Sequence, residues 1–269
     1  MAPKKAVAKA AAPSPKSAKT KIKAGVVIDL TTTDNPTSAK KAGSGKGKAS
    51  SAAPPEAAAA AAVVQGANPQ NPQELFAILC DPEDPEIISG DGICKLCELV
   101  GVDSQDRSAL MLFWRLGAGT KPGLVTREEF IKGMAKIRKN TIQDLRAYIP
   151  HLDTGFLTYD EFREFYRFAH IFSREGTKKN LEKEMVIALL PLVLDDNRAP
   201  HLKAFLEFLA APESAEFTHI SIDAWDSFYV FNKTVNPSEL VDFDTDGSWP
   251  TILDTFVEWR QKKKSAASA

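Results

Sequence analysis

Apolar residues recur at intervals of three and four from about residue 72 to residue 259, the spacing of side chains that share one face of a helix. Before residue 72, the chain consists mainly of Ala, Lys, Pro, Ser and Gly. This pattern predicts an all-α domain over residues 73–260. Its clearest helices are expected at residues 162–172, 181–194, 201–209, 222–235 and 250–260.

Two places in this domain resemble the second half of a helix-loop-helix calcium-binding unit, the EF hand. They are residues 123–130 and 155–162, and each contains a Thr followed three residues later by a Glu, the capping box that starts a helix. Calcium needs oxygen ligands, which the expected ligand positions mostly lack. Those positions include Ala118, Pro122, Pro150 and Leu152. We therefore expect helix-loop-helix units of EF-hand shape without metal.

A third loop of this kind lies near the C-terminal end of the domain. Its alternating acids are Asp242, Asp244 and Asp246. The position that needs a bidentate Glu holds Leu253 instead, so we expect no metal here. The loop is better interpreted as the start of the last helix, with Ser248 as its cap and Pro250 in its first turn.

Charge separates the chain into two parts. Residues 1–66 carry eleven Lys and three acidic residues, a net charge of +8, whereas residues 67–269 carry 23 basic and 32 acidic residues, a net charge of −9. A segment rich in Lys, Ala and Pro buries too little apolar surface to offset its ordering entropy. We expect a disordered tail over residues 1–72 and a basic, disordered C-terminus over residues 261–269. The tail suits nuclear import or weak contact with nucleic acid; a solubilising tail and a transit peptide are the alternatives.

One apolar island interrupts the tail at residues 26–31. It consists of a β-branched run with an acid inside it: Val26, Val27, Ile28, Asp29 and Leu30. Such a segment suits addition as a strand to the edge of a partner's sheet, and it resembles a SUMO-interacting motif. The island predicts a contact with SUMO.

The chain shows no pattern typical of an active site or a cofactor site. Cys80, Cys94 and Cys97 are odd in number and have no His at metal-ligand spacing, which favours buried thiols in a reducing compartment. No Ser lies in a nucleophile elbow. No run of about 18 apolar residues occurs, so we expect no membrane span. These observations favour an intracellular adaptor over an enzyme.

Residues 242–259, DFDTDGSWPTILDTFVEW, resemble the potentiating-neddylation (PONY) domain of the defective-in-cullin-neddylation (DCN-like) proteins. Residues 162–172, 181–194 and 222–225 share the resemblance, which extends from about Gln73 to Trp259. It implies an all-helical scaffold ligase that binds two partners and contributes no catalytic residue.

The resemblance implies a site for the winged-helix domain of a cullin. Carried over residue by residue, this site falls on Asp223, Ser248 and Asp254. Ser248 stands where the family usually has Ala, which adds a hydroxyl group at a close contact. The two aspartates can remain solvated until a basic partner arrives.

The resemblance also implies a pocket for the acetylated N-terminal Met of the conjugating enzyme. Its apolar residues would be Ile93, Ala109, Leu110, Leu112, Phe113, Val125, Phe172, Leu189 and Leu192. Core packing is the alternative for each of them. Phe113 replaces a residue that is small in the family, and the loop at residues 117–124 is one residue longer, so we expect a reshaped pocket.

The function implied is that of a co-ligase in cullin neddylation, in the nucleus and cytoplasm. Binding the cullin and the conjugating enzyme together would promote transfer of the ubiquitin-like modifier, with a RING-type ligase subunit as an indirect partner. The alternative is a chromatin or SUMO-linked adaptor that acts through the basic tail.

Overall fold

The computed structural model describes residues 69–267, except residues 239 and 241. The first half of this part holds α2 (Pro72–Leu79), β1 (Ile87–Ile88), α3 (Gly90–Val100), α4 (Arg107–Leu116), β2 (Val125–Thr126), α5 (Arg127–Lys136) and α6 (Ile142–Tyr148). The second half holds α7 (Tyr159–Phe172), β3 (Leu181–Glu182), α8 (Lys183–Val193), α9 (Leu202–Ala210), β4 (His219–Ile220), α10 (Ile222–Thr234) and α11 (Thr251–Ala267). Three short 3₁₀ turns, η1 (Ile149–His151), η2 (Thr154–Phe156) and η3 (Pro212–Ser214), complete it. The all-α prediction is confirmed.

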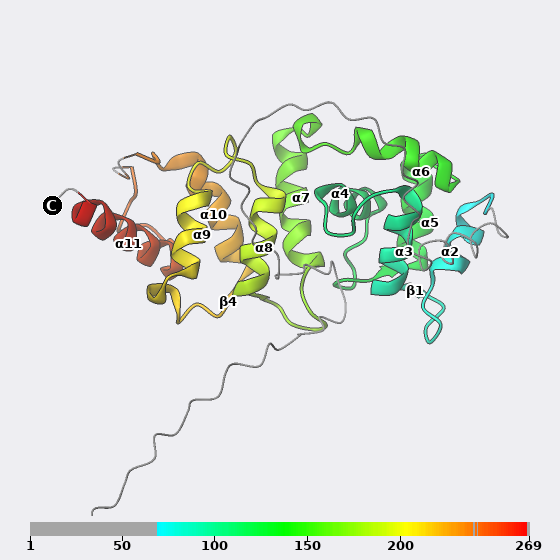
Figure 1. Cartoon of the computed structure of the whole chain (residues 1–269), viewed down its shortest axis with the longest axis horizontal. Coiled ribbons are helices and arrows are strands. Elements are labelled where there is room, and N and C mark those ends of the chain that lie inside the picture. The colour runs from blue at the N-terminus through cyan, green and yellow to red at the C-terminus, as the bar shows by residue number, and fades with distance from the viewer. Residues whose placement is uncertain (1–68, 239, 241, 268–269) are drawn as a thin grey trace, which may run out of the picture.

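Two antiparallel pairs of very short strands organise the helices. Strand β1 pairs with β2 through Ile88 and Val125, and β3 pairs with β4 through Leu181 and Ile220. Each strand lies between two helices, so α2–α5 form one pair of EF-hand-like units and α7–α10 form a second pair. Figure 1 shows α2–α6 at one end of the domain, α9–α11 at the other, and α7 between them.

Residues 123–130 and 155–162 each lie in a helix-loop-helix with a capping box, as predicted, but only residues 123–130 also contribute a strand. The first contains strand β2, whereas the second contains the turn η2 and the start of α7. The strand before α8 instead occupies Leu181–Glu182, so the helix expected at residues 181–194 begins only at Lys183. That strand needs a partner 38 residues further along, at His219–Ile220, which local spacing does not reveal.

Both predicted capping boxes are present and fix where α5 and α7 begin. In α5, the backbone N–H of Glu129 donates to Oγ1 of Thr126, and the Glu129 carboxylate accepts from the Thr126 N–H at 2.8 Å. Thr158 and Glu161 make the same reciprocal pair at the start of α7. Each box satisfies two backbone N–H groups that a helix start otherwise leaves unpaired.

The two halves of the domain share one apolar core with many aromatic residues. Its centre is the pair Tyr166 of α7 and Trp225 of α10, whose rings stack with centroids 4.6 Å apart. Tyr166 Oη donates to the Trp225 carbonyl oxygen, and Trp225 Nε1 donates to the Tyr166 carbonyl oxygen, both at 2.9 Å. The pair buries two large rings without leaving their polar atoms unsatisfied, and it fixes α10 against α7.

The last helix differs from its prediction at both ends. It begins at Thr251, so Pro250 precedes the first turn and accepts a hydrogen bond from the Leu253 N–H at 2.8 Å. Ser248 lies too far before the helix to cap it. The helix then continues through Ala267, so the prediction of a disordered C-terminus is wrong for residues 261–267. Packing against α9 accounts for the extension, because Lys263 forms an ion pair with Glu207.

Several predictions fall outside the described residues. They are the disordered state of residues 1–68, the SUMO-interacting-like island at residues 26–31, and the state of residues 268 and 269. Within residues 69–267, apart from 239 and 241, no helix is long and apolar enough to cross a bilayer.

Candidate protein-binding surfaces

An acidic groove lies between α10 and the loop that precedes α11. Its volume is about 390 Å³. One wall comes from α10 and the other from the loop, and the lining residues are Asp226, Ser227, Val230, Asp244, Gly247, Ser248 and Trp249. The α10 residues follow the i, i+4 spacing of one helix face. Val230 is 40% exposed, an unusual exposure for a large aliphatic side chain in this domain, so the α10 wall combines a carboxylate with an exposed apolar side chain.

The start of α10 orients Asp223 towards solvent beside this groove. The Ser221 side chain caps the helix by accepting from the Ala224 N–H at 3.1 Å. Asp223 lies in the first turn, where the positive end of the helix dipole favours a carboxylate. One turn later, Asp226 forms an ion pair with Arg167 of α7 at 2.8 Å. Burial raises the pKa of Asp226, an effect that Arg167 partly opposes and that the nearby Asp223 reinforces.

The loop wall of the groove is held by its own aspartates. Oδ1 of Asp244 accepts from the Asp246 N–H at 3.0 Å, and the Asp244 carbonyl oxygen accepts from the Gly247 N–H at 3.1 Å. Trp249 stacks on Phe243 with centroids 5.8 Å apart, which fixes the loop against the core. These contacts place Ser248 at the groove. Among the described residues, no group of three or more His, Cys, Asp or Glu side chains is arranged to hold a metal ion.

Asp254 lies outside the groove, in the first turn of α11. Its side chain is half-buried, and burial, followed by the nearby Glu258 carboxylate, raises its pKa. Ser248 therefore lines the groove together with the α10 residues that follow Asp223. Asp254 lies in the next helix, α11. No contact described for residues 69–267 links Asp254 directly to Asp223.

The residues assigned to the acetyl-Met pocket lie mostly in the core. Eight of them are at most 1% exposed, and only Leu192 is half-buried. The ring of Phe113 stacks on Phe172 with centroids 5.6 Å apart and planes 17° apart. Phe172 stacks in turn on Phe168, which approaches the loop at Gly119. In this arrangement, Phe113 fills the volume that a pocket between α4 and α7 would need.

Comparison with known proteins finds similar chains. Residues 144–259 match the family model described as cullin binding. DCN1-like protein 3 of Homo sapiens and of Rattus norvegicus are each 33% identical over 198 residues, which cover 72% of this chain and 64% of the relative. DCN1-like protein 5 of Homo sapiens is 29% identical over 181 residues, 67% of this chain and 74% of the relative. The chain is thus similar to DCN1-like proteins.

The acidic groove lies inside the region that matches the cullin-binding family model. That region begins within α6 and ends within α11, and it contains Asp223, Ser248 and Asp254. It does not contain α2–α5. The chain spans 64% of the length of the DCN1-like protein 3 relatives.

Sequence reasoning missed the three α10 residues of the groove, Asp226, Ser227 and Val230. The available signal was their position three, four and seven residues after Asp223, on the same face of one helix. The loop wall could not be paired with this face from spacing alone, because it lies more than ten residues further along the chain. Val230 falls in the helix predicted over residues 222–235, but the exposure of its side chain was not predicted.

The three thiols of the chain are all free. Cys97 is buried, as predicted, whereas Cys94 is exposed and Cys80 is half-buried, so the prediction of buried thiols is wrong for Cys94. Burial raises the pKa of Cys97 to about 12, with smaller contributions from Cys94 and Asp103. A thiol with such a pKa stays protonated at neutral pH and is a poor nucleophile.

Proposed function

We propose that the chain is a non-catalytic scaffold ligase in cullin neddylation. The observation that carries the proposal is the acidic groove of α10, which lies within the residues that match the cullin-binding family. Carboxylates beside an exposed aliphatic side chain suit a basic surface with apolar side chains, and complementary charge favours fast and selective association. The winged-helix domain of a cullin is the partner proposed for this surface, through Asp223, Ser248 and Asp254.

The second partner proposed is the acetylated N-terminus of the conjugating enzyme, bound between α4, α7 and α8. Burying a charged amine in an apolar site costs several kcal/mol, whereas an acetylated amine needs only its hydrogen bonds satisfied. The Phe113 ring occupies this region, so binding requires that ring to move or the Met to enter beside it. The RING-type subunit would be an indirect partner through the cullin.

Holding both partners at once would speed transfer of the modifier without a catalytic residue in this chain. Tethering raises the effective concentration of the charged conjugating enzyme near the cullin Lys and restricts its orientation. The acidic groove lies between α10 and the loop before α11, whereas the region proposed for the acetylated Met lies between α4, α7 and α8, so the two sites use different helices (Figure 1). This separation suits simultaneous binding of two proteins.

A reconstituted reaction tests the proposal. The initial rate of modifier transfer to a cullin–RING complex is measured with and without the full chain. We expect the rate to rise with the full chain, and to rise less when the conjugating enzyme is not acetylated. An unchanged rate at saturating concentrations of the chain would contradict the proposal.

Deleting residues 1–66 separates this function from the adaptor role. The domain retains every residue of the proposed cullin site, so stimulation should persist after deletion. Binding to SUMO, nucleic acid or a nuclear import receptor should be lost if the tail carries it. Loss of stimulation in the deleted chain would instead favour the tail as the active part.

A further inference from the structure

A second depression, of about 530 Å³, lies on the opposite half of the domain, over the crossing of α4 and α5. Its floor is formed where Gly133 of α5 meets the end of α4. A Cβ atom at Gly133 would lie 2.1 Å from the Leu116 carbonyl oxygen, so the two helices can approach this closely only with Gly at this position. Charged side chains surround the floor: Glu86, Lys121, Arg127, Glu128, Glu129, Lys132 and Lys136.

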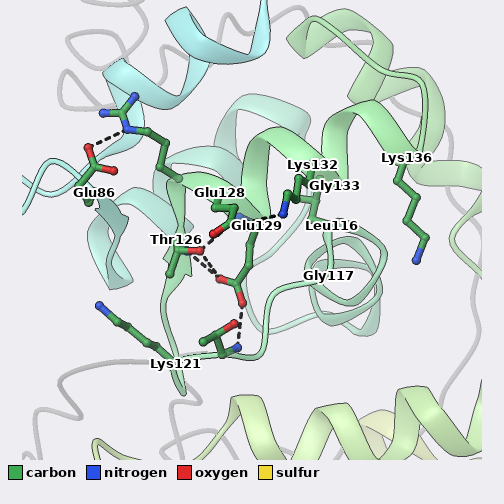
Figure 2. A pocket seen from close by; sticks show the side chains of 12 residues that line it. Glu86, Leu116, Gly117, Lys121, Thr126, Glu128, Glu129, Lys132, Gly133 and Lys136 are labelled. Carbon is green, nitrogen blue, oxygen red and sulfur yellow. Dashed lines mark hydrogen bonds and ion pairs between the residues drawn. The ribbon is translucent and has the colours of Figure 1, made fainter.

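Every carboxylate of the depression already has a partner within the chain (Figure 2). Glu86 pairs with Arg127 at 2.9 Å, and Glu128 pairs with Lys132. Glu129 accepts from the N–H groups of Thr120 and Thr126, both at 2.8 Å, and from Oγ1 of Thr126 at 2.9 Å. The acids therefore offer little to a ligand.

The cations are more numerous than these acids, and two of them remain free. Lys121 and Lys136 are exposed and have no ion pair among the described residues; Figure 2 shows them at different sides of the depression. The charge continues beyond the rim at Arg138 and Lys139, of which Lys139 lies over the Tyr148 ring. Residues 115–146 hold eight basic and three acidic residues, a net charge of +5, whereas residues 67–269 as a whole have a net charge of −9. A basic surface on an acidic domain indicates a specific partner rather than general solubility.

We propose that this basic depression is a docking site for an acidic segment of a partner protein. Free ammonium groups on both sides of an open, polar depression can each pair with a carboxylate of an extended peptide. The depression is lined by α4, α5, the segment between them and Glu86 before β1. All of these precede residue 144, so the depression is separate from the residues that match the cullin-binding family. The inference therefore does not rest on the proposed cullin site. It gives the domain two faces of opposite charge for two different partners.

A nucleic acid fits this surface less well than an acidic peptide. A phosphate backbone carries continuous charge and would pass the side chains of Glu86 and Glu128, which are 68% and 74% exposed. The depression has no aromatic side chain on which a base could stack. A peptide can place its carboxylates only where the cations are and avoid the acids between them.

The test uses the full chain and a fluorescein-labelled probe peptide in which Glu alternates with Ser. Fluorescence anisotropy at low salt measures its affinity for the wild type, for Lys121→Glu/Lys136→Glu, and for a control, Lys179→Glu/Lys203→Glu, with the same change in net charge. All three chains share the basic tail, so a difference between the two double variants reports the depression. We expect the first variant to bind about tenfold more weakly, since each exposed charge pair contributes up to about 1 kcal/mol. The control should lose less than half as much free energy of binding.

Two further measurements make the result decisive. Nuclear magnetic resonance of the ¹⁵N-labelled full chain should show the probe shifting the amide signals of Lys121 and residues 132–139. Equal losses in the two double variants, or shifts confined to residues 1–68, would overturn the proposal. An oligonucleotide of twenty thymidines serves as a competing probe. If the Lys121→Glu/Lys136→Glu change weakens oligonucleotide binding more than peptide binding, the surface is a nucleic-acid site and the assignment to an acidic protein is wrong.

Discussion

The guanidinium group of Arg260 donates a hydrogen bond to Nδ1 of His201 at 2.7 Å. The ring of His201 is fully buried, and its Nε2 atom donates to the Val235 carbonyl oxygen at 2.9 Å. Burial lowers the pKa of His201, so the ring stays neutral and Nδ1 is free to accept. Arg260 also donates to the Pro237 carbonyl oxygen. One side chain of α11 thus links the start of α9 to the segment that follows α10.

We expect Arg260→Ala to lower the free energy of unfolding by about 1–3 kcal/mol, because Nδ1 of the buried His201 would lose its donor. Urea unfolding followed by circular dichroism measures the loss. Gln261→Ala, an exposed change in the same helix, serves as the control and should stay within about 0.5 kcal/mol of the wild type. Equal effects of the two changes would show that the Arg260 contact does not stabilise the fold.

The same contact explains why the end of α11 could not be predicted. Residues 261–267 contain three Lys and no apolar residue larger than Ala, so their pattern is that of a solvated tail. Their helix persists because Arg260 and Lys263 meet His201 and Glu207, which lie more than 50 residues earlier in the chain. Tertiary contacts stabilise this helix end, which has no periodic apolar residues of its own.

Local signals predicted much of the rest. The capping boxes at Thr126 and Thr158 fixed two helix starts, and the three-and-four spacing identified the helices of the second half. Pairing between distant segments was out of reach, as the strand at Leu181–Glu182 shows. For the candidate sites, the family motif indicated Asp223 and Asp254, whereas the burial of Phe113 against Phe172 depends on packing that no motif encodes.

Stability should fall with acid because of His170 of α7. Its Nε2 atom donates to the Ile220 carbonyl oxygen at 3.1 Å, and burial lowers its pKa to about 4, although that hydrogen bond opposes the shift. Arg174 and Arg167 lower the pKa further. A His that is neutral when folded must be protonated as the pH falls, so its stabilising effect is complete above about pH 6.5 and is lost as the pH falls towards 4. The loss from this residue is about 3 kcal/mol.

Thermal unfolding between pH 7.5 and pH 4 measures this loss. The control is His170→Gln, which keeps a donor for Ile220 and does not titrate. We expect its melting temperature to depend less on pH than that of the wild type. Parallel curves would show that other groups cause the acid sensitivity.

Phe113 should control access to the region proposed for the acetylated Met. Phe113→Leu removes the ring that stacks on Phe172, so we expect a loss of about 1–2 kcal/mol of stability. The space released should strengthen binding of an acetylated N-terminal peptide of the conjugating enzyme about fivefold. Isothermal titration calorimetry with the acetylated and the free-amine peptide measures the affinity, and urea unfolding measures the loss of stability.

The matched control for this change is Phe130→Leu. Phe130 is also fully buried, but it packs on Phe76 and was not assigned to the pocket. The Phe130→Leu variant should lose a similar free energy of unfolding while its affinity for the peptide stays unchanged. If Phe113→Leu leaves the affinity unchanged as well, the ring does not limit access to the site.

Charge reversal at Asp223 and Asp254 should abolish cullin binding. The variant Asp223→Lys/Asp254→Lys places two cations where a basic partner is expected, and like charges at an interface cost several kcal/mol. We expect the affinity for a cullin winged-helix domain, measured by surface plasmon resonance, to fall at least about tenfold. Glu98→Lys/Glu216→Lys carries the same change in net charge on exposed sites elsewhere and should bind almost as well as the wild type. Wild-type affinity in the first variant would remove these residues from the cullin site.

Cullin binding should also weaken in mild acid, and Asp254 should account for part of the effect. Burial, followed by the nearby Glu258 carboxylate, raises the pKa of Asp254 above its ordinary value of 3.8. A cationic partner favours the ionised carboxylate, so the complex lowers this pKa and binding is strongest above the raised value. As the pH falls from 7.5 towards 4, Asp254 takes up a proton at a higher pH than an ordinary Asp does, and the affinity declines. Asp254→Asn should bind more weakly at pH 7.5 yet lose less affinity on acidification, and an equally steep decline in both proteins would assign the pH dependence to other groups.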